Sequence, residues 1–259
     1  MRDILLQTGR RFIAFLQYLG GLTSLSLLTL IWLFAAPFKW KYVIQQMKKI
    51  GYDSMPIVFL VALFTGIVLA LQSAYQMQKI SAEMYIASLV SLSMTRELGP
   101  VLTALVVAGR VGAAITAELG TMKVTEQIDA LEAMAAPPVQ HLVVPRFLAS
   151  IFMLPLLTIY ADAIGIFGGY LVGVYKLNLS SSIYINMSFD PLVMKDLMTG
   201  LYKTFFFAAI IALVGCFEGF QTEGGAEGVG LATTRSVVIS FILIIATDCL
   251  FTVLFYFIF

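Results

Sequence analysis

Ionisable residues inside long apolar stretches are the part of this sequence best placed to do chemistry. They occur at Arg96, Glu97, Arg110, Glu118, Asp162, Lys203, Glu218 and Asp248. Such a side chain costs roughly 2.5–3.5 kcal/mol at the centre of a membrane helix, so it normally faces a bundle interior or a wet cavity. We therefore expect these groups to line a path or pocket or to pair, and Lys203 with Asp248 forms one candidate pair from different segments.

Signatures of catalysis or metal binding are absent from the sequence. His141 is the only histidine, and there is no zinc-protease, serine-hydrolase or phosphate-loop motif. An intramembrane aspartyl pair would have to use Asp162 and Asp248, and Asp248 lacks glycine-rich surroundings. The stretch GFQTEGGAEGVG (219–230) has no following basic residue and predicts a flexible turn. We expect no enzyme activity, metal or cofactor in this chain.

The composition predicts an all-α integral membrane protein. Of 259 residues, 60% are hydrophobic and 12% charged, about half the charged share of soluble domains. Apolar runs of the length needed to cross a bilayer recur from end to end, leaving no room for a separate soluble domain. The net charge of +1 gives no reason to expect nucleic acid as a partner.

The predicted domain covers residues 1–259 and has two parts. Residues 1–52 form an entry region, with an amphipathic interfacial helix over the first twenty residues and a shallow or re-entrant segment over 20–38. The core (53–259) contains about five spans, at roughly 53–78, 98–120, 146–176, 201–221 and 234–257. Seven Lys and Arg residues precede Asp53, which predicts a cytoplasmic N-terminus and a C-terminus on the outer face.

Small residues recur every four positions in the second span. They are Ala104, Ala108, Gly112, Thr116 and Gly120, and the third span repeats the device with Gly165, Gly169 and Gly173. Small residues let membrane helices approach closely. The pattern fits packing within one bundle, and equally a helix that slides or pairs across a dimer.

A short acidic amphipathic helix is predicted near 121–135, between the second and third spans. Its apolar stripe consists of Val124, Ile128, Leu131 and Ala135. Glu126, Asp129 and Glu132 lie off this stripe, and Pro137-Pro138 stop the helix. Acidic groups sit poorly beside anionic lipid, which favours docking to a soluble partner over a helix resting on headgroups.

The segment SMTRELGPVLTAL (93–105) predicts a helix start, because proline suits a first helical turn. Arg96 and Glu97 would then lie at the outer edge of the second span. They would form either a polar rim beside an apolar pocket or an interfacial anchor.

The segment RELGPVLTALVVAGRVGAAITAELGTMKVTEQIDALEAM (96–134) resembles the signature region of the MlaE (YrbE) permease family, the membrane subunits of ABC-type lipid transporters that work with MCE proteins. VVPRF (143–147), the glycine-rich third span and ATTRSVV (232–238) also fit. Ala136-Pro137-Pro138 departs from the expected Asp-Pro but keeps the helix stop.

The resemblance implies a homodimeric permease in the bacterial inner membrane, with a cytoplasmic N-terminus and a periplasmic C-terminus. Its implied partners are a separate ABC ATPase that carries ATP and magnesium, an MCE-protein hexamer, a small STAS-type accessory subunit and phospholipid. The implied lipid-binding residues are Leu69, Gln72, Tyr75, Gln76, Met77, Ile80 and Leu98. The implied gating charges are Arg96, Glu97, Lys203 and Asp248, and the implied ATPase-coupling residues are Glu126, Gln127, Asp129 and Glu132.

Other function classes stay open on the residues alone. An ion-coupled carrier or channel would use Glu97, Lys203 and Asp248 as its path and would run without an ATPase. A structural scaffold would tolerate pocket mutations without loss of lipid traffic. The sequence leaves open which lipid is carried and in which direction.

Overall fold

The computed structural model describes residues 2–34 and 40–258, apart from the side chains of 2–8, 11, 12, 14, 15, 80 and 258, and all regular elements in these residues are helical. The helices are α1 (Arg2–Leu33), α2 (Trp40–Ile50), α3 (Met55–Met77), α4 (Ile86–Ser93), α5 (Gly99–Val107), α6 (Ala113–Val124), α7 (Gln127–Ala133), α8 (Val144–Tyr175), α9 (Ser181–Phe189), α10 (Met194–Phe220) and α11 (Gly225–Ile258). Three π-helical turns join or begin helices: η4 (Met94–Leu98), η5 (Ala108–Gly112) and η6 (Val139–Val143). Short 3-10 turns lie at η1 (Tyr52–Ser54), η2 (Gln78–Ile80) and η3 (Glu83–Tyr85).

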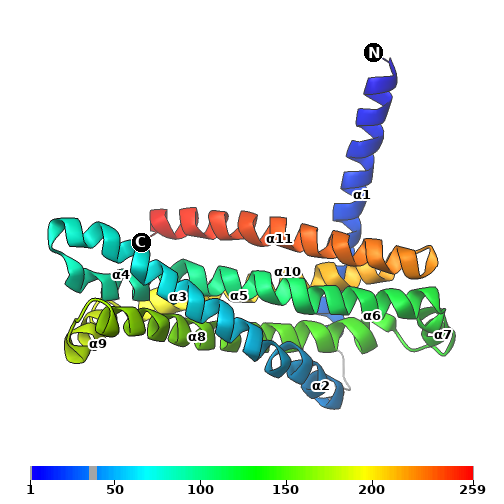
Figure 1. Ribbon diagram of the computed structural model, residues 1–259. Coiled ribbons are helices and arrows are strands. Elements are labelled where there is room, and N and C mark those ends of the chain that lie inside the picture. The colour runs from blue at the N-terminus through cyan, green and yellow to red at the C-terminus, as the bar shows by residue number, and fades with distance from the viewer. Residues whose placement is uncertain (1, 35–39, 259) are drawn as a thin grey trace.

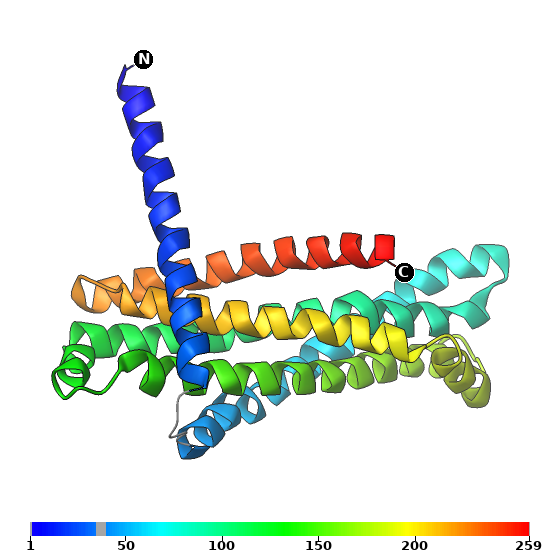
Figure 2. The ribbon, with the colours of Figure 1, turned by 180° about the vertical axis from the view of Figure 1, so that it is seen from behind.

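The long helices run side by side and give the bundle two distinct ends (Figure 1, Figure 2). Helix α7 and the turn between α10 and α11 lie at one end, which we call the α7 end. The hairpin between α3 and α4, the short helix α9 and the C-terminus lie at the other, the α9 end. Helix α8 alone, at 32 residues, extends for ~48 Å. That is longer than the ~30 Å hydrocarbon core of a bilayer, so both ends reach the polar interface.

Each of the five predicted spans coincides, to within one residue at its end, with part of a longer apolar helical segment. The segments long and apolar enough to cross a membrane are Leu16–Leu33, Trp40–Met77, Glu83–Val124, Val139–Tyr175, Met194–Phe220 and Gly225–Phe257. The all-α membrane fold is thus confirmed. The second, third and fourth segments begin well before the predicted residues because they continue through turns that resemble breaks in the sequence.

Helix α1 differs from the predicted entry region. It is one continuous helix, so the expected change of structure near residue 20 is wrong. Leu16–Leu33 meets the length and hydropathy test for a sixth span, yet little of it is buried. In both views α1 leans across the direction of the other long helices and leaves the bundle (Figure 1, Figure 2). Its direction favours the interfacial placement. The apolar side chains predicted for its membrane face before Leu16 lie outside the described side chains.

The small-residue ridge of the second span packs inside this chain. Ala104, Ala108 and Thr116 are fully buried, and the Thr116 hydroxyl donates to the Gly215 carbonyl oxygen of α10 at 3.0 Å. A methyl group added at Gly120 would lie 2.8 Å from Thr222 Oγ1. The packing interpretation is therefore confirmed, and this ridge is not free to pair across a dimer.

The glycines of the third span serve the same purpose against other neighbours. A Cβ at Gly165 would collide with Met94, and one at Gly173 would collide with the Tyr184 ring of α9. Tyr184 is itself among the most deeply buried large side chains. Helix α8 thus holds η4 on one side and α9 on another.

Candidate functional site

The turn η4 lies where the sequence predicts the start of the second span. The α-helix α5 does begin at Gly99 with Pro100 in its first turn, but the span does not start there, because helical backbone precedes it. The chain runs as helix from Ile86 through η4 into α5, with the Gly99 N–H donating to the Met94 carbonyl in a π-type bond. Pro100 has no N–H, so the Arg96 carbonyl four residues earlier lacks its usual helical donor. A π turn accommodates this gap, which is why a Gly-Pro pair can occur inside a continuous helix.

Lys203 supplies a donor to the Arg96 carbonyl in place of the N–H that Pro100 lacks. Its side chain is fully buried on α10, and its ammonium lies 3.4 Å from the Arg96 carbonyl oxygen, 2.6 Å from Glu97 Oε2 and 2.8 Å from Thr252 Oγ1. Asp248 Oδ1 of α11 is 2.9 Å away. The Thr252 hydroxyl also donates to Glu97 Oε1 at 3.0 Å. We call Glu97, Lys203, Asp248 and Thr252 the charge cluster; it joins η4, α10 and α11.

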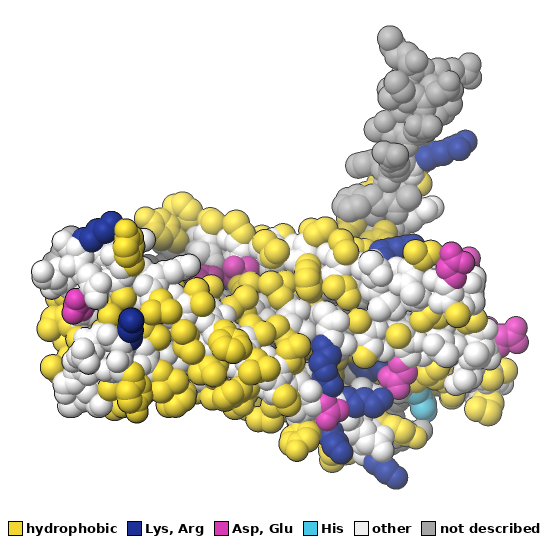
Figure 3. Space-filling model, in the orientation of Figure 1, with side chains coloured by type: hydrophobic (Ala, Val, Ile, Leu, Met, Phe, Trp, Pro, Cys, Tyr) yellow, Lys and Arg dark blue, Asp and Glu magenta, His cyan; other side chains and the backbone are white. Residues whose placement is uncertain are grey.

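The charge cluster carries one cation against two carboxylates. The Lys203 side chain is 0% exposed, whereas those of Glu97 and Asp248 are 40% and 21% exposed. The lysine of the cluster is therefore buried in the bundle, and the two carboxylates lie on its open side. Figure 3 shows acidic side chains in a hollow beside α11, on an otherwise apolar flank.

Arg96 faces a different partner from its neighbour Glu97. Its Nε donates to Asp196 Oδ1 at 2.8 Å, and Asp196 also accepts from the backbone N–H of Val193 at the start of α10. Asp196 is buried, while the Arg96 side chain is half-exposed. Arg96 thus ties η4 to the first turn of α10, two turns before Lys203.

The predicted lipid-binding residues occupy one side of α3 and the edge of η4. Leu69, Met77 and Leu98 pack around the same buried cluster, which includes Ala70, Ala74 and Val90. Gln72, Tyr75 and Gln76 are exposed on α3, and the Tyr75 ring lies 4.4 Å from Lys79 Nζ. The side chain of Ile80 lies outside the described side chains. The structure therefore brings the apolar members together and leaves the polar ones on an open face.

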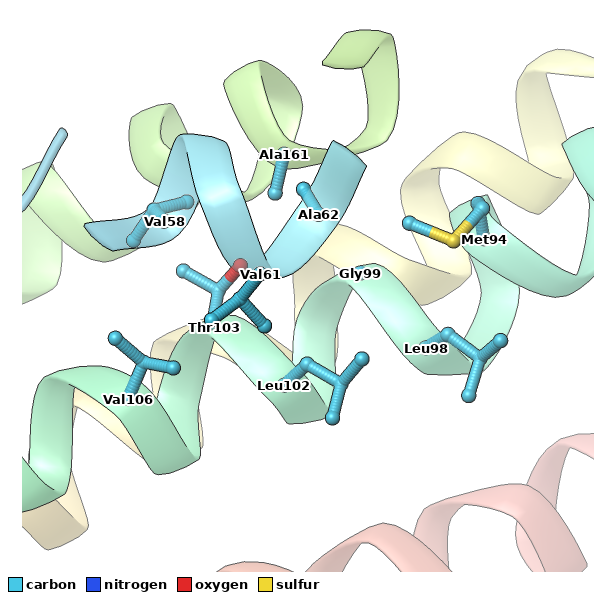
Figure 4. A pocket seen from close by; sticks show the side chains of 10 residues that line it. All are labelled: Val58, Val61, Ala62, Met94, Leu98, Gly99, Leu102, Thr103, Val106 and Ala161. Atoms are coloured by element: carbon cyan, nitrogen blue, oxygen red, sulfur yellow. The ribbon is translucent and has the colours of Figure 1, made fainter. Parts of the chain in front are cut away.

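Within one copy of the chain, no lipid-sized chamber lies at the α3–α5 junction. The cavity there is about 10 Å³, the size of one water, and is lined among others by Val61, Ala62, Leu98, Leu102 and Thr103. Figure 4 shows that Leu98 and Leu102 point away from α3, toward the side on which α11 passes. The apolar side chains of η4 and α5 thus face an open surface between α3 and α11.

The predicted coupling helix is shorter than the sequence suggested. Glu126 adopts a left-handed backbone conformation (φ 58°), and α7 spans only Gln127–Ala133. It ends before the prolines, because the Ala136 and Ala135 N–H groups donate to Leu131 and Glu132 in a Schellman arrangement. Of the predicted apolar stripe, Ile128 is buried and Leu131 half-buried, whereas Val124 and Ala135 are exposed.

The acidic residues of α7 differ in their partners. Asp129 Oδ1 lies 2.7 Å from Lys123 Nζ, so this charge is matched within the chain. Glu126 and Glu132 are exposed and have no ion-pair partner among the residues that the structure describes. Gln127 donates to the Thr125 hydroxyl at 3.1 Å, which braces the sharp entry to the helix.

Comparison with known proteins places the whole arrangement in a family. The model of the family described as Permease MlaE matches residues 43–254. The chain belongs to the MlaE permease family. A probable ABC transporter permease protein of Rickettsia bellii is 45% identical over 96% of both chains. The intermembrane phospholipid transport system permease protein MlaE of Haemophilus influenzae is 41% identical over 81% of this chain and 80% of its own. The chloroplastic protein TRIGALACTOSYLDIACYLGLYCEROL 1 of Arabidopsis thaliana is 35% identical over 81% of this chain and 60% of its own.

Two residues that hold the predicted charges of this MlaE permease were missed from the sequence: Thr252 of the charge cluster and Asp196, the partner of Arg96. Asp196 lies seven residues before Lys203, and Thr252 lies four residues after Asp248, so each shares a helical face with a predicted residue. This spacing is the signal in the sequence that could have identified both residues. By contrast, Asp162 does not pair with Asp248: it packs against Gly99, and its Oδ1 has no hydrogen-bond partner in the described chain. Glu218 is buried near the α7 end, 3.7 Å from Arg235.

Proposed function

We propose that this MlaE-family chain is the membrane permease of an ABC-type transporter that moves phospholipid between its membrane and an MCE-protein tunnel. The observation that carries the proposal is the charge cluster, a buried lysine with two part-exposed carboxylates at the edge of an apolar face. Such a face suits acyl chains, and polar groups at its edge suit a headgroup. The name of the Haemophilus relative, an intermembrane phospholipid transport system permease, supports the choice of phospholipid.

The open α3–α11 side supports a homodimer in which two copies complete one lipid chamber. Leu69, Met77 and Leu98 would contact acyl chains, and Gln72, Tyr75 and Gln76 would lie nearer the headgroup. Ile80 follows directly on this segment of the chain. Because the cavity at the α3–α5 junction holds only about one water, the transported lipid would lie between copies or beside α11.

The charge cluster would act as a latch on α11. Separating α11 from η4 would break the contacts of Lys203 with Asp248 and of Thr252 with Glu97. Stranding one member of a buried ion pair typically costs about 3–5 kcal/mol, so the latch would not open without an energy source. Arg96, held by Asp196, would keep η4 fixed to α10 while α11 moves.

An ATPase partner at α7 would supply that energy. Residues from Ile86 to Val124 form one helical rod of ~58 Å that links α7 to the charge cluster. The π turns η4 and η5 are the places where such a rod bends most readily. Glu126, Gln127 and Glu132 would contact the ATPase, with Asp129 holding the helix through Lys123. ATP and magnesium would bind to that partner, and a small STAS-type subunit would accompany it.

The proposed orientation is supported by the positive charges of the α7 end. Lys41, Lys48, Lys49, Lys123 and Arg235 belong to the α7 end, which is therefore proposed to face the cytoplasm. The N-terminus would then be cytoplasmic, and the α9 end with the C-terminus would face the periplasm and the MCE protein.

An ion-coupled carrier is the second candidate, favoured by the excess carboxylate in the charge cluster. The two functions separate in one experiment. The protein is purified with its co-purifying subunits, reconstituted with fluorescent phospholipid, and assayed with and without ATP. ATP-dependent lipid movement that is lost in Glu97→Gln supports the permease. Movement that follows an ion gradient without ATP, or a protein isolated without lipid or ATPase, refutes it.

A further inference from the structure

Helix α2 presents two lysines on its exposed side that no described carboxylate neutralises. Lys41 and Lys48 are exposed and seven residues apart, so they share one face and lie ~10.5 Å apart along the axis. Their neighbour Lys49 is different, because its ammonium lies 3.1 Å from Glu118 Oε1. Two cationic side chains with spare charge thus stand on the same side of a short helix.

Hydrogen bonds and packing fix α2 against the bundle. Arg110, from the π turn η5, donates to the Lys49 carbonyl oxygen at 3.1 Å and to Ser54 Oγ at 2.7 Å. Glu118 joins Lys49 to the buried Arg146, whose Nη2 lies 3.0 Å away. Val43 and Ile50 of α2 are also buried. The positions of Lys41 and Lys48 are therefore set by the fold and are not those of a loose basic tail.

The surroundings of these lysines are those of a lipid interface. Trp40, Tyr42 and Ile44 are 62%, 51% and 63% exposed on the same helix. Tryptophan and tyrosine concentrate at membrane–water boundaries, and lysine extends its ammonium toward phosphates while its stem stays apolar. Figure 3 shows dark blue side chains gathered over α2 at the edge of the apolar flank.

We propose that the α2 face binds anionic phospholipid headgroups of the adjacent leaflet, as a site separate from the transported lipid. A membrane protein needs positive charges near its spans for orientation, but that rule asks only for their presence in a flanking segment. Here two lysines are held at a fixed spacing beside exposed aromatic and aliphatic side chains. Two phosphates with apolar tails match this combination better than an acidic protein surface does.

The test is lipid binding by the purified complex, measured by native mass spectrometry with added phosphatidylglycerol or phosphatidylcholine. Lys41→Gln with Lys48→Gln is expected to weaken phosphatidylglycerol binding about 30-fold, which corresponds to ~2 kcal/mol for two lysines near a headgroup. Lys41→Arg with Lys48→Arg should bind as the parent does. The matched control removes two charges from the α9 end, as Lys176→Gln with Lys195→Gln, and should leave binding unchanged.

Three results would overturn the proposal. They are unchanged phosphatidylglycerol binding in the glutamine pair, equal binding of phosphatidylcholine by the parent, and loss of a protein subunit from the glutamine pair while lipid binding persists. The last would make α2 a protein-docking face. Failure here is distinguishable from failure of the transport proposal, because Glu97→Gln should stop transport and leave phosphatidylglycerol binding at α2 intact.

Discussion

Removal of the Lys203 ammonium should destabilise the bundle far more than loss of any exposed charge. In Lys203→Met the carboxylates of Glu97 and Asp248 face each other without the cation that now lies 2.6 and 2.9 Å from them. Removing one partner of a fully buried pair costs about 3–5 kcal/mol, and because the two carboxylates are part-exposed we expect a loss at the lower end, about 3 kcal/mol. At about 2–4 °C per kcal/mol for a chain of about this size, the melting temperature should fall by roughly 6–12 °C.

The assay is thermal unfolding of the detergent-solubilised complex, followed by tryptophan fluorescence or by loss of the monodisperse peak. Lys195→Met on the same helix is the matched control, because that side chain is exposed. A triple variant, Lys203→Met with Glu97→Gln and Asp248→Asn, should recover most of the lost stability, since no charge is left stranded. It should still fail to transport lipid. An unchanged melting temperature in the single variant, or no recovery in the triple, would refute the latch.

Three further outcomes are expected from other parts of the fold. Glu126→Lys with Glu132→Lys should abolish co-purification of the ATPase while bound phospholipid is retained; an intact complex would remove α7 from the interface. Gly66→Ala places a methyl group against the α8 backbone and should lower stability by about 1–3 kcal/mol, as overpacking of a core does. Gly230→Ala, whose methyl group meets open space, should leave stability unchanged, and equal melting temperatures of the two variants would contradict the close α3–α8 contact. Pro100→Ala supplies an N–H that competes for the carbonyl now facing Lys203, so transport should slow with little loss of stability, and unchanged transport would show that this carbonyl has no part in the latch.

Much of the membrane fold could be predicted because bilayer physics constrains it tightly. A run such as 234–257 has almost no alternative to a spanning helix, and all five predicted spans match helical segments to within one residue at their ends. It could also be predicted that the charged residues as a set would pair or line a cavity, because a charge inside a membrane is too costly to face lipid. The pairing of Lys203 with Asp248 was proposed from sequence, and the structure brings those atoms to 2.9 Å.

What could not be predicted depends on local backbone geometry. By ordinary rules Gly99-Pro100 predicts a helix start. In the structure the helix is continuous, and the Lys203 ammonium donates to the Arg96 carbonyl in place of the N–H that Pro100 lacks. Glu126 in a left-handed conformation shortens α7 in a way that no propensity indicates, because glutamate seldom adopts it. The role of Asp196 needs the contact with Arg96, which spans 100 residues of sequence.

The π turn η5 also determines how this sequence must be aligned and engineered. Residues four apart turn by about 40° per step on an α-helix, so the ridge from Ala104 to Gly120 would wind by about 160° and leave its partner. The wide turn at Ala108–Gly112 absorbs one residue, or about 100° of rotation, and keeps the ridge on α10. Deleting a single residue there, such as Gly109, would turn the wide turn into an ordinary α turn and leave Arg96 and Glu97 on the same face relative to α7, whereas a deletion in the regular part of the rod would rotate them by about 100°. A helical wheel drawn across this turn assigns wrong faces to one half of the rod, whichever half sets its origin.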